Sequence, residues 1–172
     1  VVSITGGKNG SMVCDAGAGA AHLTKLLAEK GFNIRAVEPN DAMRANGIKN
    51  TAKYSNVEWF EGVGEYTGQP ADAFDLVTFG SSFSVTDRQK ALAETKRILK
   101  PGGWFACMWN HRDLSDPLQA KIEAVIKHYV PDYSYGMRRE DQTDVIMESN
   151  MFDSIQSFSG KVIHKVPVED VI

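Results

Sequence analysis

The sequence has few of the features that mark specialised classes of protein. It contains no apolar run of about 18 residues, and its start does not resemble a signal peptide, so we expect no association with a membrane. The 4 histidines form no tight cluster with cysteine or aspartate, which argues against a built-in metal site. A net charge of -3 offers no basic surface, so we expect no nucleic-acid partner. The sequence also has no internal repeat and no low-complexity linker.

What the sequence does have is enough apolar material for one sizeable core. Of its 172 residues, 42% are hydrophobic, so we expect a single domain over residues 1–172. Strand-like and helical segments alternate, which is typical of a doubly wound α/β layer. The expected strands are 12–15, 33–38, 57–61, 74–79 and 104–109. Short helices are expected after the first two strands, the second of them capped by Asn40 or Asp41, and a longer one from Asp87 to Leu99.

The most informative segment runs from Met12 to Gly31. It indicates a buried strand, a tight turn containing Gly17 and Gly19, and an amphipathic helix that ends at Gly31. One face of that helix is expected to carry Leu23, Leu26 and Leu27. Backbone amides at such a turn and the positive end of the helix favour a nucleotide-like cofactor, although the glycines could also serve only a turn with positive φ.

The glycine spacing discriminates between cofactors. A dinucleotide fingerprint requires a third glycine where this chain has His22. Asp15 stands where a pyrophosphate would meet negative charge, and it suits a cationic ligand such as an ammonium or sulfonium group. S-adenosylmethionine carries both groups and no phosphate. The alternative role of Asp15 is to cap the helix.

Five segments in order carry a resemblance to a known family. They are the D-x-G-x-G turn at Asp15, the acidic strand end at Val37-Glu38-Pro39, the segments Phe60–Glu65 and Ala73–Thr78, and Arg97–Gly103. Together, over about 100 residues from Met12 to Asn110, they resemble the class I S-adenosylmethionine-dependent methyltransferases of the type 11 group. The resemblance implies a Rossmann-like, mostly parallel sheet of strand order 3-2-1-4-5 with later strands, incomplete here at both ends. It also implies methyl transfer to a small-molecule acceptor by in-line displacement, with S-adenosylhomocysteine as the product.

The resemblance also implies which residues contact the cofactor. Asp15 would face the ammonium group directly or through water, and Glu38 would bind the ribose hydroxyls, a role it would share with NAD enzymes. Met43 and Phe83 are each either cofactor neighbours or core residues. The full set of expected cofactor contacts is Asp15, Ala16, Gly17, Ala18, Gly19, Glu38, Pro39, Met43, Gly62, Val63, Gly64, Glu65, Gly80, Ser81 and Phe83.

The chain departs from the family pattern at two places. Val63 stands where the family often has an aspartate that accepts a hydrogen bond from the adenine amine, which leaves backbone groups of Val63 and Gly64, with Glu65 as a candidate to compensate. Ser84 and Val85 stand where the family often has a His-Trp pair, so the easiest catalytic assignment is lost.

Candidate acceptor-side residues follow the fifth strand. His111 is the one histidine near the expected site and is our candidate base, although a lone histidine at a strand end is more often structural. Arg138 and Arg139 would bind an anionic substrate or form part of a solvated loop. Residues 112–150 are expected to be a helical insertion that forms the substrate region, with one helix starting at Asp116-Pro117 and an apolar stripe of Ile122, Val125, Ile126 and Tyr129. A second helix is expected at Glu140–Ser149 and a strand at Ile155–Val166.

The two cysteines indicate a reducing compartment. In a 3-2-1-4-5 sheet the strands of Cys14 and Cys107 are separated by the fourth strand, about 9–10 Å apart, too far for a disulfide. We therefore expect a cytoplasmic protein. Two alternatives to a methyltransferase stay open: a relative that binds S-adenosylmethionine without methyl transfer, and, disfavoured by His22 and Asp15, an NAD(P)-dependent Rossmann oxidoreductase. The acceptor, its reacting atom (O, N or C) and the oligomeric state stay undetermined by the sequence.

Overall fold

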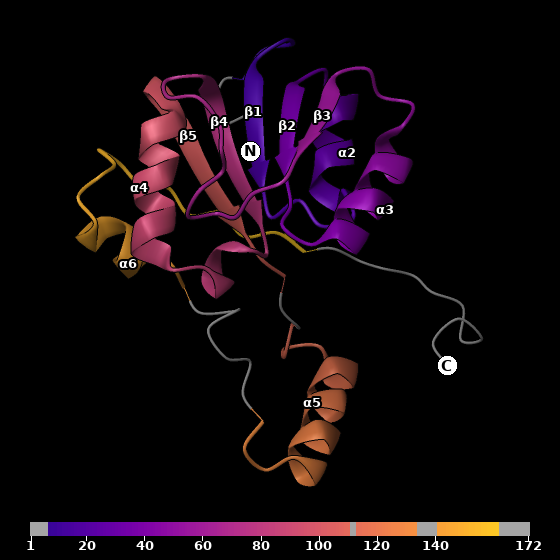
Figure 1. The fold of residues 1–172 in the computed structure, drawn as a ribbon. Coiled ribbons are helices and arrows are strands. Elements are labelled where there is room, and N and C mark those ends of the chain that lie inside the picture. The colour runs from indigo at the N-terminus through magenta and orange to yellow at the C-terminus, as the bar shows by residue number, and fades with distance from the viewer. Residues whose placement is uncertain (1–6, 111–112, 134–140, 162–172) are drawn as a thin grey trace.

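A five-stranded parallel sheet forms the centre of the protein (Figure 1). The structure, a computed structural model, describes residues 7–110, 113–133 and 141–161. The strand order is β3-β2-β1-β4-β5, which confirms the predicted order 3-2-1-4-5. The strands are β1 (Met12–Ala16), β2 (Asn33–Val37), β3 (Val57–Phe60), β4 (Phe74–Gly80) and β5 (Leu99–Met108).

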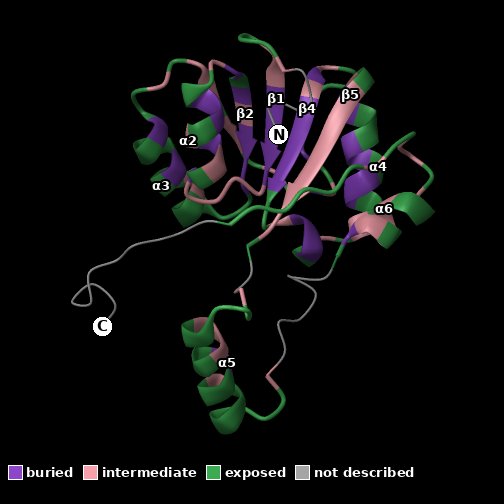
Figure 2. Ribbon diagram, turned by 180° about the vertical axis from the view of Figure 1, so that it is seen from behind, coloured by how far each residue is buried: buried purple, intermediate pink, exposed green. Residues whose placement is uncertain are grey.

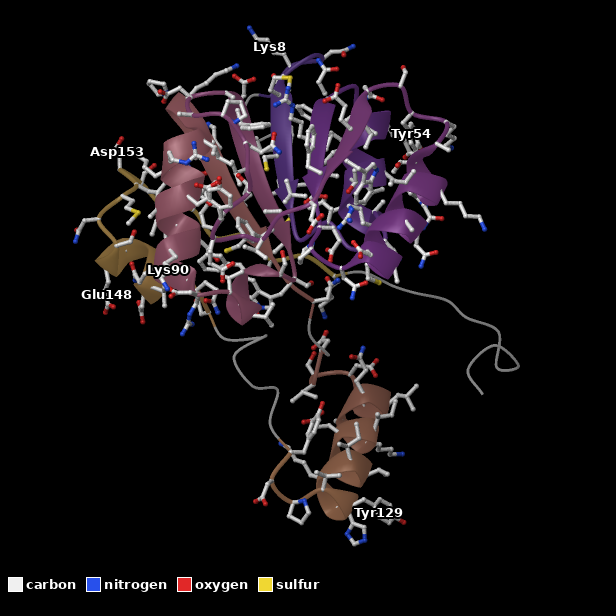
Figure 3. The ribbon with its side chains drawn as sticks, viewed as in Figure 1. Lys8, Tyr54, Lys90, Tyr129, Glu148 and Asp153 are labelled. Carbon is white, nitrogen blue, oxygen red and sulfur yellow. The ribbon has the colours of Figure 1, made fainter. Side chains whose placement is uncertain are left out.

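Helices cover both faces of this sheet, as the doubly wound prediction requires. On one side lie α2 (His22–Glu29) and α3 (Asp41–Thr51); on the other lie α4 (Arg88–Ile98) and α6 (Thr143–Glu148) (Figure 1). A short 3-10 helix, η1 (Phe83–Val85), follows β4. The helix α5 (Pro117–Tyr129) stands apart beyond the edge at which the strands end, so that Tyr129 and Lys8 lie at opposite ends of the molecule (Figure 3).

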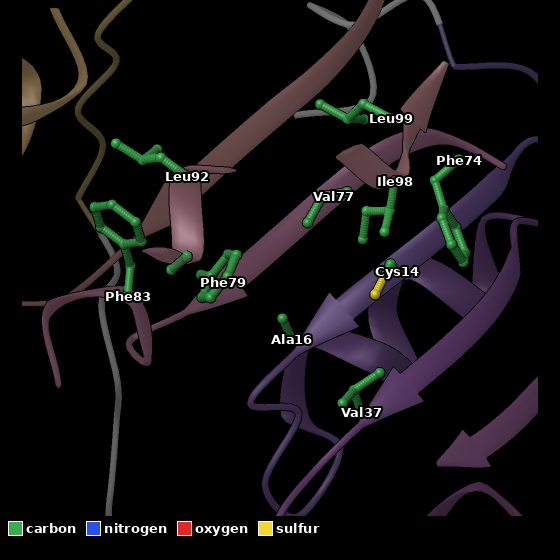
Figure 4. Close-up of a cluster of buried hydrophobic side chains, with 11 residues drawn as sticks. Cys14, Ala16, Val37, Phe74, Val77, Phe79, Phe83, Leu92, Ile98 and Leu99 are labelled. Atoms are coloured by element: carbon green, nitrogen blue, oxygen red, sulfur yellow. The ribbon is translucent and has the colours of Figure 1, made fainter. Parts of the chain in front are cut away.

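The core has two layers because successive side chains of a strand point to opposite faces. Cys14 and Val77 join the layer beneath α4, together with Leu92 and Ile98 of that helix (Figure 4). Val13 and Leu76 join the layer beneath α2. The inner strands β1 and β4 are accordingly the most buried parts of the chain (Figure 2).

Side-chain caps begin three helices where the sequence places them. Asn40 Oδ1 accepts from the amide of Met43 (3.0 Å), and Asp87 Oδ1 accepts from the amide of Lys90 (3.2 Å). Asp116 caps α5 in the same way, with Pro117 as the first helical residue. Each cap satisfies an amide that the helix itself cannot pair.

Several expectations need correction. Leu26 is 61% exposed, because the short helix α2 buries the narrower face formed by Thr24, Leu27 and Ala28. The expected apolar stripe of α5 does not pack: Ile122, Val125 and Tyr129 are 42%, 57% and 77% exposed, since the helix stands away from the sheet.

The boundaries near β5 and α6 also differ from expectation. β5 starts at Leu99 rather than Trp104, because Leu99 already pairs with Phe74 before the chain loops out through Gly102 (φ 76°) and rejoins β4. The second helix after β5 is shorter than predicted, and Glu140 lies outside the described residues. Residues 155–161 form no strand, contrary to prediction, and residues 162–166 of that expected strand lie outside the described part.

Both cysteines are free, and β4 separates their strands as predicted. Burial raises the pKa of the Cys107 thiol to about 11 and that of Cys14 further still. Within the described ranges, no helix combines the length and apolarity needed to cross a membrane.

Candidate functional site

The glycine turn between β1 and α2 lies at the edge where the strands end. Gly17 and Gly19 have positive φ values of 69° and 56°, which favour glycine. A Cβ on Gly17 would lie 2.5 Å from the Cβ of Ser82, so this position also lacks room for a side chain. A Cβ on Gly19 would meet only the Cε of Met43 at 3.5 Å, which leaves space above the turn.

The amides of this turn are used within the protein. Gly17 N and Ala18 N both donate to the carbonyl of Val37 (2.8 and 3.0 Å), and Gly19 N donates to Glu38 Oε2 (2.8 Å). The turn is thereby folded over the end of β2. Contrary to the expectation from sequence, these three amides donate within the protein, so they are not available to a pyrophosphate.

Glu38 carries the polar chemistry of the site. Its side chain is held in place twice, because Oε2 accepts from Gly19 N and Oε1 accepts from Asn40 N (2.9 Å). Arg44 Nη1 fixes the main chain by donating to the Glu38 carbonyl (2.7 Å). Each carboxylate oxygen has two lone pairs, so each keeps one for a further donor. A pair of neighbouring hydroxyl groups fits this arrangement.

Asp15 lies beneath the turn and is completely buried. Its two oxygens accept hydrogen bonds from Thr24 Oγ1 of α2 (2.7 Å) and Thr78 Oγ1 of β4 (2.8 Å). Burial raises the pKa of this carboxyl group, an effect that the two threonine hydrogen bonds oppose. Asp15 thus joins β1, α2 and β4, and it exposes no atom to the ammonium group that the sequence assigns to it. Direct contact is excluded in this geometry.

The loop after β3 forms the next part of the edge. Val63 and Tyr66 exchange both main-chain hydrogen bonds (3.1 Å each), and the Val63 side chain is 42% exposed. The Val63 amide is therefore already used. Glu65, the expected compensating residue, accepts from the amide of Asp87 through Oε1 (2.6 Å). Adenine recognition by these residues stays a prediction, for which the candidates are the second lone pair of the Val63 carbonyl, the main-chain groups of Gly64 and the second carboxylate oxygen of Glu65.

The segment after β4 packs onto the glycine turn. Ser82 Oγ donates to the carbonyl of Ala16 (2.7 Å), and Gly80 and Ser81 are exposed beside it, Ser81 with φ 70°. Phe83 is 2% exposed, with its ring 5.3 Å from that of Phe105. This position fits the core alternative for Phe83.

A small recess opens next to this segment, lined by Ser81, Phe83, Ser84, Cys107, Met108, Trp109 and Gln142. Gln142 belongs to the expected insertion 112–150 and is buried there. A larger hollow of about 230 Å³ lies at the opposite edge of the sheet, beside Lys8 and Trp104, and contains no predicted site residue.

The structure therefore groups most of the predicted residues along one edge. Ala16, Gly17, Ala18, Gly19, Glu38, Pro39 and Met43 lie around the first turn, Gly62 to Glu65 follow β3, and Gly80 and Ser81 follow β4. His111, Arg138 and Arg139 lie outside the described residues. Sequence reasoning missed Thr24, Thr78 and Ser82, whose only signal was a hydroxyl residue on a buried strand, helix or turn. The part of the chain that the structure describes holds no cluster of three or more potential metal ligands.

Comparison with known proteins identifies the family of the chain. A family model described as a methyltransferase domain matches residues 14–107. The ubiquinone/menaquinone biosynthesis C-methyltransferase UbiE of Vibrio vulnificus is 30% identical over 138 residues, which cover 76% of this chain and 53% of that protein. The UbiE protein of Escherichia coli O139:H28 is 29% identical over 138 residues, 76% of this chain and 55% of that protein. The chain thus spans about half the length of the curated relatives it matches.

Solved structures share the fold. A protein of Methanococcus maripaludis proposed to be an S-adenosyl-L-methionine-dependent methyltransferase superposes with a TM-score of 0.68 at 23% identity, covering 87% of this chain and 70% of that chain. A SAM-dependent methyltransferase of Aquifex aeolicus gives 0.59 at 20% identity, covering 74% and 75%. The [4+2]-cyclase SpnF gives 0.58 at 21% identity, covering 62% and 41%.

Proposed function

The chain belongs to the methyltransferase domain family, and from this membership we propose that it binds S-adenosylmethionine and transfers its methyl group to a small-molecule acceptor. The observation that carries the proposal is Glu38, whose two fixed oxygens each keep one lone pair for the two hydroxyls of a ribose. A ligand with a ribose and no phosphate at the turn fits the used amides of Gly17 to Gly19.

The other residues of the edge fit the rest of this cofactor. Open space above Gly19, bounded by Met43, accommodates the nucleoside next to Glu38. A Cβ on Gly80 would lie 3.3 Å from Leu23 Cδ2, so the missing side chain accommodates α2, and Gly80 and Ser81 stay exposed after β4. The methionine part would follow the segment from Gly80 to Ser82.

The proposed methyl transfer depends mainly on how the protein orients the acceptor towards the methyl group. When bound, S-adenosylmethionine supplies a methyl group already activated by the sulfonium centre. The protein has to hold the acceptor in line with that methyl group and keep water away. The recess beside Ser84, Trp109 and Gln142 has a volume of about 10 Å³, which is room for about one water, so the acceptor would need more space than this recess offers. A base is required only for acceptors that first lose a proton, and His111 stays the candidate.

The acceptor class can be narrowed by the relatives. UbiE proteins are named as C-methyltransferases of ubiquinone and menaquinone biosynthesis, so we propose a quinol as the first acceptor to test. The electron-rich ring carbon of a quinol, the reduced form of a quinone, can attack the methyl group and then lose its proton. We also keep the cytoplasmic location as a proposal, supported by two free thiols on strands that β4 separates.

A second candidate is a protein that binds the cofactor without methyl transfer. One observation favours it: Ser84 and Val85 stand where the family often has a His-Trp pair, so the chain lacks the catalytic side chain that is easiest to assign. The two candidates share the cofactor site and differ only in the acceptor reaction.

Calorimetric titration tests the shared site. S-adenosylmethionine and S-adenosylhomocysteine are expected to bind, while NAD is not. Glu38→Gln should weaken binding by about tenfold or more, because a carboxylate that accepts hydroxyl groups forms the stronger hydrogen bonds. The matched control is Glu58→Gln, a 67% exposed side chain on β3. Equal affinities of both variants would refute the role of Glu38, and transfer of a labelled methyl group to a quinol would decide between the two candidates.

A further inference from the structure

The loop between β3 and β4 lies next to the proposed ribose position, and this inference rests on the proposed function. A Cβ on Gly62 would lie 2.9 Å from Val37 Cγ1 and 2.9 Å from the carbonyl oxygen of Thr67, so the loop packs directly against the strand end that precedes Glu38. Since β3 neighbours β2 in the sheet, a base attached to a ribose at Glu38 reaches this loop.

A buried carboxylate on α4 holds this loop from behind. Glu94 is 6% exposed, and its Oε1 accepts from both the amide (2.8 Å) and the hydroxyl (2.5 Å) of Thr67. Arg97 donates to both Glu94 oxygens, Nε to Oε2 (2.7 Å) and Nη2 to Oε1 (2.8 Å), and also to the carbonyl of Gln69 (2.7 Å). Burial alone would raise the pKa of the Glu94 carboxyl, but the hydrogen bonds from Arg97 and Thr67 hold it below its usual range.

The same helix holds the loop at a second point. The amide of Asp87, the cap of α4, donates to Glu65 Oε1 (2.6 Å). The loop also closes on itself through the paired main chains of Val63 and Tyr66. Gly64 fits against Phe79, whose Cε1 would be 2.8 Å from an added Cβ. Little freedom is left to the residues that face the nucleoside.

From this geometry we propose that Glu94 is a positioning residue: through Thr67 it fixes the loop 62–66 that receives the base of the cofactor. The Arg97 side chain is 42% exposed, so solvent screens its attraction for Glu94, and the ion pair by itself contributes little to stability. A pair of apolar residues could not form the hydrogen bonds that Glu94 and Arg97 make to the Thr67 amide, the Thr67 hydroxyl and the Gln69 carbonyl. The Glu94–Arg97 pair therefore sets where the loop stands.

The test compares three variants by calorimetry at a temperature where circular dichroism shows each to be folded. Glu94→Gln loses the charge, and Thr67→Val loses the hydroxyl while it keeps the amide. The control is Asp75→Asn, since Asp75 likewise accepts from a lysine (Lys100, 2.7 Å) and from a main-chain amide (Met12, 2.8 Å), but at the opposite edge of the sheet. The probes are S-adenosylhomocysteine, 5′-methylthioadenosine and S-inosylhomocysteine. The last differs from S-adenosylhomocysteine only in its base, which is hypoxanthine in place of adenine.

Both loop variants are expected to bind 5′-methylthioadenosine and S-adenosylhomocysteine about 5- to 30-fold more weakly, as for a loss of one to two kcal/mol. The ratio of affinities for the adenine and hypoxanthine ligands should also fall, which a purely structural role would not change. Asp75→Asn should match the wild type in both respects. If Glu94→Gln and Thr67→Val both keep the wild-type affinities and the wild-type ratio of adenine to hypoxanthine affinity, the positioning role is refuted. That result would leave the proposed cofactor site unaffected. Failure of the unaltered protein to bind any of the three probes would overturn the proposed function and the inference with it.

Discussion

Replacement of Asp15 separates two roles that this carboxylate could have: binding the cofactor, and accepting the buried threonine hydroxyl groups in the core. In Asp15→Ala the hydroxyls of Thr24 and Thr78 lose their acceptor inside the core. A buried polar group without a partner costs about 1–3 kcal/mol, so the two together cost about 2–6 kcal/mol. Because a domain of this kind is stable by about 5–15 kcal/mol, the variant should unfold at a much lower urea concentration.

Asp15→Asn is the matched variant. Asparagine has the same shape, and its carbonyl can accept from one threonine while its amide donates to the other. Burial raises the pKa of Asp15 above its value in the unfolded chain, so folding favours the neutral form relative to the unfolded state. The stability that this group contributes is complete below its unfolded pKa, about 3.9, and is lost as the pH rises through the higher folded value. At about pH 7 the asparagine variant should therefore equal or exceed the wild type in stability, and the difference should shrink as the pH falls towards the unfolded pKa.

Urea denaturation and calorimetry decide the question together. We expect Asp15→Asn to keep both its fold and its affinity for S-adenosylhomocysteine. A variant that folds normally but no longer binds would refute this reasoning, because it would show that the charge acts on the ligand, as the sequence predicts. Equal destabilisation by alanine and asparagine would refute it as well.

Three further predictions rest on packing and burial. Gly17→Ala should cost about 1–3 kcal/mol, from positive φ and the contact with Ser82, and Ser82→Gly should recover the steric part of the loss in thermal unfolding. Leu26→Lys should change the free energy of unfolding by less than about 0.5 kcal/mol, while Leu27→Ala should cost about 2–5 kcal/mol, and equal effects would contradict the assigned face of α2. Cys107, with its pKa raised to about 11, should react slowly with a disulfide reagent near neutral pH and rapidly in urea; fast reaction of the folded protein would contradict its burial.

Local signals and ordered motifs predict most of the fold. The D-x-G-x-G turn, the apolar strands and the caps at Asp87 and Asp116 each depend on residues within a few positions, so their structures follow from the sequence. The exposure of Leu26 does not follow in this way. It depends on how the eight residues of α2 rest on the sheet, which periodicity alone leaves undetermined.

In the candidate site, too, local features could be predicted from the sequence, whereas contacts between distant residues could not. Glu38 lies at the end of its strand, as predicted, because a strand end is a local property. The burial of Asp15 depends on Thr78, which is 63 residues away, and the grip of Glu94 on Thr67 joins residues 27 apart. Such pairs have no signature in a single sequence, since either residue would look equally suitable at the surface.

The folding of the glycine turn over the end of β2 has a consequence for competition inside a cell. Phosphate-bearing nucleotides are attracted to sites with unpaired main-chain donors, whereas Gly17, Ala18 and Gly19 have given their donors to Val37 and Glu38. ATP and NAD gain nothing from these three residues however abundant they are. A phosphate-bearing nucleotide therefore has to compete with a sulfur nucleoside for this turn without hydrogen bonds from these three amides.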